Sequence, residues 1–216
     1  MILNDVIFND EISAYKDWNI VLTKTEIAFP SPKLSTVDIK GADGVLDLSE
    51  ALTSDIKYSN RTIDITFELM DDNDYTAVIS KIGAYLHGRK ITVQFANDSM
   101  YYYVGRAVID EWECVKRKGK IVISIECEPY KYRIHETVIN VPVTSTEKTV
   151  ILTNERQRVY PTISVQGNVK MTWNDSTFDL SDGVYKLLTF YLIEGDNVVK
   201  LSGNGSAKFT YRMGAL

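Results

Sequence analysis

The stretch that decides the fold is Thr62-Ile63-Asp64-Ile65-Thr66-Phe67-Glu68-Leu69. Apolar side chains occupy every second position, and polar side chains occupy the positions between them. Successive side chains of a β-strand point to opposite faces of the sheet, so this pattern predicts a strand with one buried face and one wet face. The segment therefore predicts a sheet that covers a hydrophobic core on one side.

The same two-residue period recurs on both sides of this strand in the sequence. It is strongest at residues 121–128, and shorter strand candidates cover residues 2–8, 18–23, 35–39, 91–95 and 100–115. Many short strands separated by turns are typical of a sandwich or a barrel. The sequence therefore predicts a mainly β protein.

One segment has a helical period instead, with apolar side chains at Tyr75, Val78, Ile79, Ile82, Tyr85 and Leu86. The acidic cluster Asp71-Asp72-Asn73-Asp74 precedes it, and such side chains cap a helix N-terminus and complement its dipole. Gly88 follows, and glycine readily adopts the left-handed conformation that ends a helix. We expect a single α-helix over about residues 74–87, with His87 in a structural role at its end.

After Pro129-Tyr130-Lys131-Tyr132-Arg133, the pattern restarts with strands alone. Residues 169–173 and 207–212 alternate, and Gly203-Asn204-Gly205 predicts a turn between two strands. The charge also changes, because residues 1–133 carry 16 basic and 21 acidic side chains whereas residues 134–216 carry 8 of each. We therefore predict a first domain at residues 1–133, a β-barrel or sandwich with the helix, and a β-sandwich domain at residues 134–216.

The composition argues against nucleic acid and membranes as partners. The net charge is −5 at pH 7, whereas phosphate contacts need clustered Lys and Arg side chains. The one basic run, Lys116-Arg117-Lys118-Gly119-Lys120, predicts a hairpin tip. No basic segment precedes an apolar run near Met1, and no stretch reaches the roughly 18 apolar residues of a membrane span.

The reactive side chains argue against catalysis. His87 and His135 are far apart in the sequence and have no second His nearby, so no metal-ligand set is formed. Glu111 and Glu113 would share one side of a strand at roughly 7 Å, but this spacing alone is weak evidence for a glycosidase pair. No nucleotide-binding loop or nucleophile elbow is present. The sequence predicts no enzyme, no cofactor and no metal.

Cys114 and Cys127 fall in two strands of one expected hairpin around Lys118-Gly119. That turn would place Cys114 near Ile123 and leave Cys127 roughly 13 Å away along the strand. A disulfide cannot span this distance, so we predict two free thiols.

A second informative stretch is Ser35-Thr36-Val37-Asp38-Ile39-Lys40-Gly41-Ala42-Asp43-Gly44-Val45-Leu46-Asp47-Leu48-Ser49-Glu50-Ala51-Leu52. It resembles a hallmark of the distal tail (Dit) proteins of long-tailed, non-contractile bacteriophages. The resemblance continues through Tyr58 and residues 60–67, and it includes the expected helix, the expected hairpin and residues 194–205. The family commonly has Pro at the position of Lys40, and this difference affects only the expected shape of the turn.

The resemblance implies a first domain that builds a ring, usually a hexamer, and a second domain that is a galectin-like β-sandwich. It implies a structural hub at the distal end of the phage tail in the virion, assembled in the host cytoplasm. The partners it implies are further copies of the chain, the tail tube protein, a tail-tip or tail-associated lysin protein and a receptor-binding protein.

The candidate ring contact is the segment that contains Gly41, Asp43, Gly44, Val45, Leu46 and Leu48. The two glycines permit a tight turn between two strands, and Asp43 can hold it by accepting hydrogen bonds from backbone amides. The segment has more apolar side chains than a solvated loop requires. The alternative, an ordinary strand and turn packed on its own domain, stays equally open at this point.

The competing function is a carbohydrate-binding module, which a galectin-like sandwich would suit. Trp173 or Tyr185 would then stack on a sugar, beside convergent polar groups. The segment at residues 172–176 is equally well interpreted as a hairpin turn with a Trp in the core.

Overall fold

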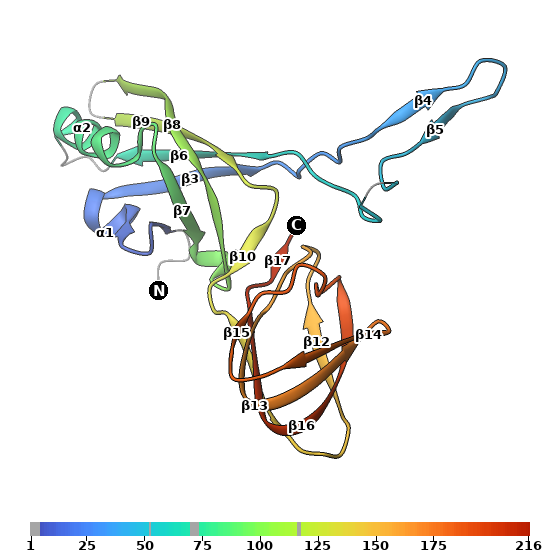
Figure 1. Ribbon diagram of the computed structural model, residues 1–216. Helices are drawn as coiled ribbons and strands as arrows, with labels where there is room; N and C mark the ends of the chain where they lie inside the picture. Colours follow the sequence, from blue (N-terminus) through green and yellow to red (C-terminus); the bar gives the residue numbers. More distant parts are fainter. Residues whose placement is uncertain (1–4, 52, 70–73, 116–117) are drawn as a thin grey trace. The chain divides into compact units, whose positions relative to one another are not determined.

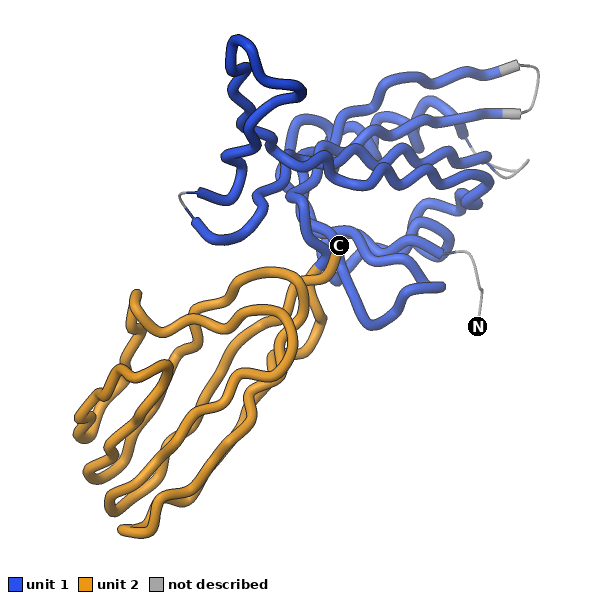
Figure 2. Tube along the Cα trace, turned by 90° about the vertical axis from the view of Figure 1, so that its right-hand side faces the viewer, with its two compact units in different colours: residues 1–131 blue, residues 132–216 orange. Residues whose placement is uncertain are grey.

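The computed structural model describes residues 5–51, 53–69, 74–115 and 118–216. The chain divides into two compact units, Met1–Lys131 and Tyr132–Leu216 (Figure 2). Both consist mainly of β-strands, which confirms the predicted fold class. The division into a ring-forming domain at residues 1–133 and a galectin-like domain at residues 134–216 stays a prediction. No helix in the described part has the length and apolarity needed to cross a bilayer.

The first unit is built on one antiparallel sheet (Figure 1). Its strands are β1 (Val6–Phe8), β2 (Ile12–Ser13), β3 (Ile20–Ile27), β6 (Arg61–Leu69), β7 (Lys90–Phe95), β8 (Tyr101–Val115) and β9 (Lys118–Cys127), in the order β2-β1-β7-β8-β9-β6-β3. In β6 the side chains of Ile63, Ile65 and Phe67 are fully buried, whereas Thr62 and Glu68 are exposed. The period of two in the deciding stretch therefore separates core from solvent as predicted.

The expected helix is α2 (Tyr75–Leu86), which buries Ile82 and Leu86 against the sheet. The side chain of Asp74 caps it by accepting hydrogen bonds from the backbone N–H groups of Thr76 and Ala77. The other acidic residues of the predicted cap, at positions 71–73, lie outside the described residues. His87 follows the helix, and its Nδ1 accepts a hydrogen bond from the Ile109 N–H at 3.1 Å, which is a structural role.

A shorter helix, α1 (Ala14–Trp18), was not expected from the sequence. Ser13 caps its start, because Ser13 Oγ accepts a hydrogen bond from the Lys16 N–H, and Asn19 ends it in the left-handed conformation. It buries the Trp18 ring 5.4 Å from the ring of Phe8. A helix of five residues is too short to show a period, so the two capping residues were its only sequence signal. A single 3₁₀ turn, η1 (Ala96–Asp98), follows β7.

A buried arginine fixes the start of β6. Arg61 is only 3% exposed, and its Nε donates a hydrogen bond to the Pro129 carbonyl at 2.8 Å. The guanidinium also lies 5.6 Å from the centre of the Tyr103 ring. Desolvation lowers the pKa of Arg61, and the carbonyl and the ring offset part of that cost. The arginine thereby ties β6 to the segment that follows β9.

The hairpin of β8 and β9 has a different register from the expected one. Cys114 lies opposite Gly119 and not near Ile123, because Val115 pairs with Lys118 and the turn therefore comes earlier than expected. A bulge between Ile109 and Glu111 shifts the register further along β8. Lys116 and Arg117 of the expected basic tip lie outside the described residues. Cys127 lies opposite Gly105, far from Cys114 along the hairpin, and both thiols are free.

We expect these two thiols to differ sharply in reactivity. Cys114 is exposed, whereas Cys127 is fully buried, and burial raises the pKa of Cys127 to about 12. At a pH of about 8, roughly one Cys127 side chain in 10⁴ would be a thiolate. Ellman's reagent should therefore modify one thiol of the folded chain rapidly and the second only after denaturation. In the variant Cys114→Ser the rapid phase should disappear, and two rapid equivalents in the unsubstituted chain would contradict the buried position.

The second unit is a sandwich organised around two long strands, β13 (Thr162–Trp173) and β16 (Gly195–Tyr211). Its other strands are β11 (Thr137–Val143), β12 (Lys148–Asn154), β14 (Ser176–Leu180) and β15 (Gly183–Tyr185). One half of β16 pairs with β12 and the other half with β11, and β13 pairs in the same way with β14 and β15. Two short strands, β10 (Lys131–Arg133) and β17 (Gly214–Ala215), pair with each other.

The expected turn at Gly203-Asn204-Gly205 does not exist, and that prediction is wrong. Strand β16 continues through these residues and remains paired with β13, with Gly203 opposite Val169 and Gly205 opposite Gly167. The two long strands thus pass together from one half of the sandwich to the other (Figure 1). We call this place the glycine corner, defined by Gly167, Gly203 and Gly205.

The glycine corner tolerates no side chain. The φ angles of Gly167, Gly203 and Gly205 are +83°, +135° and +145°, which side chains rarely allow. A Cβ atom on Gly205 would lie 1.9 Å from the Gln166 carbonyl oxygen, far inside contact distance. Glycine therefore lets both strands bend sharply while their ladder stays intact.

Candidate functional site

The first candidate site is an arm, residues 28–60, which leaves the sheet of the first unit between β3 and β6. Its paired part is β4 (Thr36–Asp38) with β5 (Val45–Asp47), and these form a two-stranded sheet of their own (Figure 1). Backbone hydrogen bonds continue toward its base, where the Lys33 N–H donates to the Lys57 carbonyl at 2.7 Å. The arm is thus an ordered hairpin and not a loose connection. Leu52, the last residue of the family-like stretch, lies outside the described residues.

The tip of the arm contains the two glycines that the sequence singled out. Gly41 and Gly44 have φ angles of +85° and +76°, and Asp38 pairs with Val45 across the hairpin, so the predicted turn between two strands is confirmed. Asp43, expected to hold this turn, makes no side-chain hydrogen bond to any described residue. The bond from the Ala42 N–H to the Ile39 carbonyl, at 3.1 Å, holds it instead.

Three polar residues below the tip lock the two strands together, and sequence analysis missed them. Ser49 Oγ accepts a hydrogen bond from the Ser35 N–H across the hairpin, and the Ser49 N–H donates to Asp47 Oδ1, both at 2.8 Å. Hydrogen bonds from the side chain and the backbone of Ser49 hold the pKa of Asp47 below its ordinary value. An Asp-x-Ser sequence at the end of a short strand was the signal that could have revealed this clamp.

The arm exposes an unusual share of apolar side chains to solvent. Val45 is 61% exposed and Leu46 48%, and five more apolar residues of the arm are also exposed: Phe29, Leu34, Val37, Ile39 and Leu48. Val37 lies directly opposite Leu46, and Leu48 points the same way two residues further, whereas Thr36 and Asp47 occupy the other face. The arm therefore has the alternation of a half-buried hairpin, but none of the described residues of its own unit covers the apolar face.

The two candidate sugar-binding residues of the second unit do not form one site. Trp173 is only 7% exposed, and its ring packs 5.4 Å from that of Phe190 and 5.1 Å from that of Tyr191. Asn174 and Asp175 form the adjacent two-residue turn with positive φ angles. The segment is therefore a hairpin turn with a Trp in the core, and this ring offers no face on which a sugar could stack.

Tyr185 lies at the opposite end of β13 from Trp173, because it pairs with Ile163. Its hydroxyl donates a hydrogen bond to the Ser181 carbonyl at 3.1 Å. The ring is half-buried, and its hydrogen bond ties it to the turn between β14 and β15.

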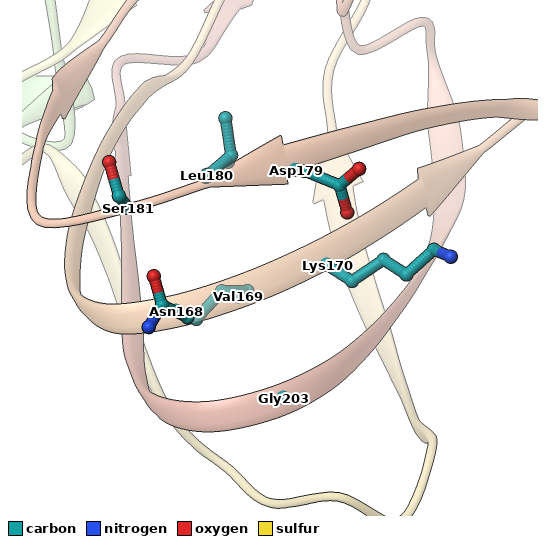
Figure 3. A pocket seen from close by; sticks show the side chains of 7 residues that line it. All are labelled: Asn168, Val169, Lys170, Asp179, Leu180, Ser181 and Gly203. Atoms are coloured by element: carbon teal, nitrogen blue, oxygen red, sulfur yellow. The ribbon is translucent and has the colours of Figure 1, made fainter.

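A pocket of about 290 Å³ lies beside that turn, between β13, β14 and the glycine corner. Figure 3 shows the polar side chains around it: Asn168 and Lys170 from β13, Asp179 from β14, and Ser181. Lys170 and Asp179 are cross-strand neighbours. Gly203 also lines the pocket, and it has no side chain to fill the space. The seven residues that line the pocket include no aromatic ring, so it lacks the stacking surface that the sugar-binding hypothesis requires.

The described residues hold no group of three or more His, Cys, Asp and Glu side chains that could bind a metal ion. Of the carboxylate pair considered above, Glu111 lies 3.5 Å from Lys120 Nζ in an exposed ion pair. The side chain of Glu113 is also exposed. These groups have the ordinary setting of a solvated strand face.

No protein-family model matches the sequence, and no curated protein matches it either. Among solved structures, the chain is similar to SPP1 Dit (gp 19.1), described as a paradigm of the hub adsorption apparatus in phages that infect Gram-positive bacteria. The two chains are 14% identical, the TM-score is 0.68, and the likeness covers 99% of each chain. The chain thus shares its overall fold with a Dit protein over its whole length.

Proposed function

We propose that the chain is a distal tail protein: a ring-shaped structural hub between the tail tube and the proteins of the tail tip. The fold shared with SPP1 Dit over 99% of each chain supports this role, and so does the family-like stretch that forms the arm. In this role the protein would lie at the distal end of a phage tail. The tail tube protein would dock on one side, and a tail-tip, lysin or receptor-binding protein on the other.

The observation that carries the proposal is the uncovered apolar face of the arm. Val37, Leu46 and Leu48 share one face, and burying a side chain of this size is worth roughly 1.5–3 kcal/mol. A ring is closed by the same head-to-tail contact repeated around an axis, so each copy must reach the next. An ordered hairpin that leaves its own sheet is suited to this contact. The neighbouring copy would supply the cover that the arm lacks within its own unit.

The test is the oligomeric state of the chain and of two matched variants. The unsubstituted protein should elute as a ring, with a mass near 147 kDa for six copies of 24.5 kDa. Leu46→Asp should yield a folded monomer, because a carboxylate on the apolar face opposes burial against a neighbour. The monomer should still unfold in one cooperative transition, since Leu46 is exposed and is not among the buried core residues of its own unit. Size exclusion with light scattering, followed by thermal melting, measures both quantities.

The control is Val45→Asp, which places the same charge one residue away on the opposite face of the hairpin. It should leave the ring intact or weaken it far less than Leu46→Asp does. Equal loss of assembly in both variants would mean that the neighbour surrounds the arm on both faces. An unfolded Leu46→Asp protein would show that Leu46 supports its own unit, and a monomeric unsubstituted chain at micromolar concentration would remove self-assembly without partners from the proposal.

A further inference from the structure

A second pocket of the second unit has a composition that the hub function does not explain. Its volume is about 320 Å³, and it lies where the start of β13 and the end of β16 meet Glu136 and the segment at residues 157–160. Thr162 of β13 and Thr210 of β16 are directly opposite each other, and both alternate with buried neighbours, so their side chains lie on the outer face of the sheet. These two hydroxyl groups form part of the pocket wall.

Three cationic side chains line this pocket, Arg158, Lys186 and Arg212, against a single carboxylate, Glu136. The surrounding unit is almost neutral, since residues 134–216 carry equal numbers of basic and acidic side chains. The excess of two positive charges is therefore local to the pocket. Positive charge concentrated in a concavity attracts anions more strongly than the same charges spread over a surface.

Two of the cations are held in place by other contacts. Arg212 Nη2 lies 3.5 Å from Glu136, and Arg212 Nη1 donates to the carbonyl oxygens of Arg133 and Ile134. The Arg158 guanidinium lies 4.4 Å from the centre of the Tyr191 ring. Side chains that are already ordered lose less conformational entropy when a ligand binds.

Lys186 provides the charge that protein groups do not compensate. It is exposed, and within the described residues no carboxylate lies within ion-pair distance of its ammonium group. Tyr160 adds a partly exposed ring to the same pocket, and that ring packs edge-on against Tyr191 at 6.0 Å. The pocket thus combines cations, two hydroxyl donors and an aromatic surface.

We propose that this pocket binds the phosphate ester of a small polyol or sugar. The phosphate oxygens would accept hydrogen bonds from Lys186 and the arginine side chains and from the hydroxyls of Thr162 and Thr210. A volume of about 320 Å³ exceeds what a lone phosphate fills and is at the lower end of ordinary ligand pockets. The polyol or sugar part would occupy the rest of the pocket, against Tyr160. This inference rests on the second unit alone and does not depend on ring formation.

The test is calorimetric titration of the full-length chain with three probes: glycerol 3-phosphate, inorganic phosphate and glycerol. Glycerol 3-phosphate should bind saturably and more tightly than phosphate, and glycerol should show no binding. Lys186→Gln should weaken glycerol 3-phosphate binding about tenfold, because it removes one charge-assisted hydrogen bond. Raising the salt concentration should also weaken binding, because the pocket is open to solvent.

The matched control is Lys208→Gln, which removes an exposed lysine from β16 that is not part of the pocket. It should leave the affinity unchanged. No saturable heat from either phosphate compound would overturn the proposal. Equal losses in the Lys186 and Lys208 variants would also overturn it, because binding would then reflect the general surface charge. If the chain were monomeric and still bound glycerol 3-phosphate, the pocket proposal would hold although the ring proposal had failed.

Discussion

Replacing Gly205 with Ala is expected to prevent folding of the second unit, or to lower its free energy of unfolding by more than about 4 kcal/mol. The added Cβ would lie 1.9 Å from the Gln166 carbonyl oxygen and 2.9 Å from its carbon. Both atoms belong to the backbone of the paired strand, so no side-chain rotation can relieve the clash. The φ angle of +145° adds strain, because residues with a Cβ rarely adopt it. Relief would require β13 and β16 to separate at the corner.

Gly195→Ala is the matched control in the same strand. Its φ angle is +89°, but no atom lies within 4 Å of the place that a Cβ would take. Only the conformational cost remains, about 1–2 kcal/mol. Scanning calorimetry of both variants, read at the transition of the second unit, measures the difference. If the two variants lost equal stability, the results would contradict the close approach of β13 to β16 at Gly205.

The glycine corner also shows where inference from sequence reaches its limit. Gly203-Asn204-Gly205 has the composition of a turn, and local propensity cannot distinguish a turn from a bend inside a long paired strand. The difference depends on Gly167, which lies opposite Gly205 but 38 positions away in the sequence. Half-buried strands such as β6 could be predicted, because burial on one face makes apolar and polar residues alternate along the sequence.

The candidate site was predictable only in part. The turn at Gly41 and Gly44 follows from glycine chemistry, and the apolar content of residues 45–48 indicated a contact surface. Sequence could not decide whether that surface was covered by its own domain, because Val37, Leu46 and Leu48 show the same alternation as a core strand. The structure leaves these side chains exposed. For Trp173 the outcome is the opposite, because the structure buries a side chain that the sequence could also place at the surface. Its ring neighbours, Phe190 and Tyr191, lie on another segment of the chain.

Phe67→Ala is expected to lower the free energy of unfolding of the first unit by about 3–5 kcal/mol. Phe67 is fully buried at the centre of the sheet, where it lies opposite Leu22 of β3 and Ile121 of β9, and its ring is 6.4 Å from that of Phe8. Truncation removes a whole ring and leaves a cavity that strands paired on both sides cannot close. For a unit of this size, the melting temperature should fall by about 10–20 °C.

The same variant tests whether the two units fold independently, as the predicted domain division requires. In scanning calorimetry of the full chain, Phe67→Ala should shift one transition and leave the other within about 1 °C, whereas Gly205→Ala should affect only the second. Glu68→Ala is the control for the first unit, because Glu68 is the exposed neighbour on the wet face of β6 and its loss should cost less than about 0.5 kcal/mol. If Phe67→Ala lowered both transitions together, the two units would unfold as one cooperative body. The fragment of residues 134–216 would then not be expected to fold alone.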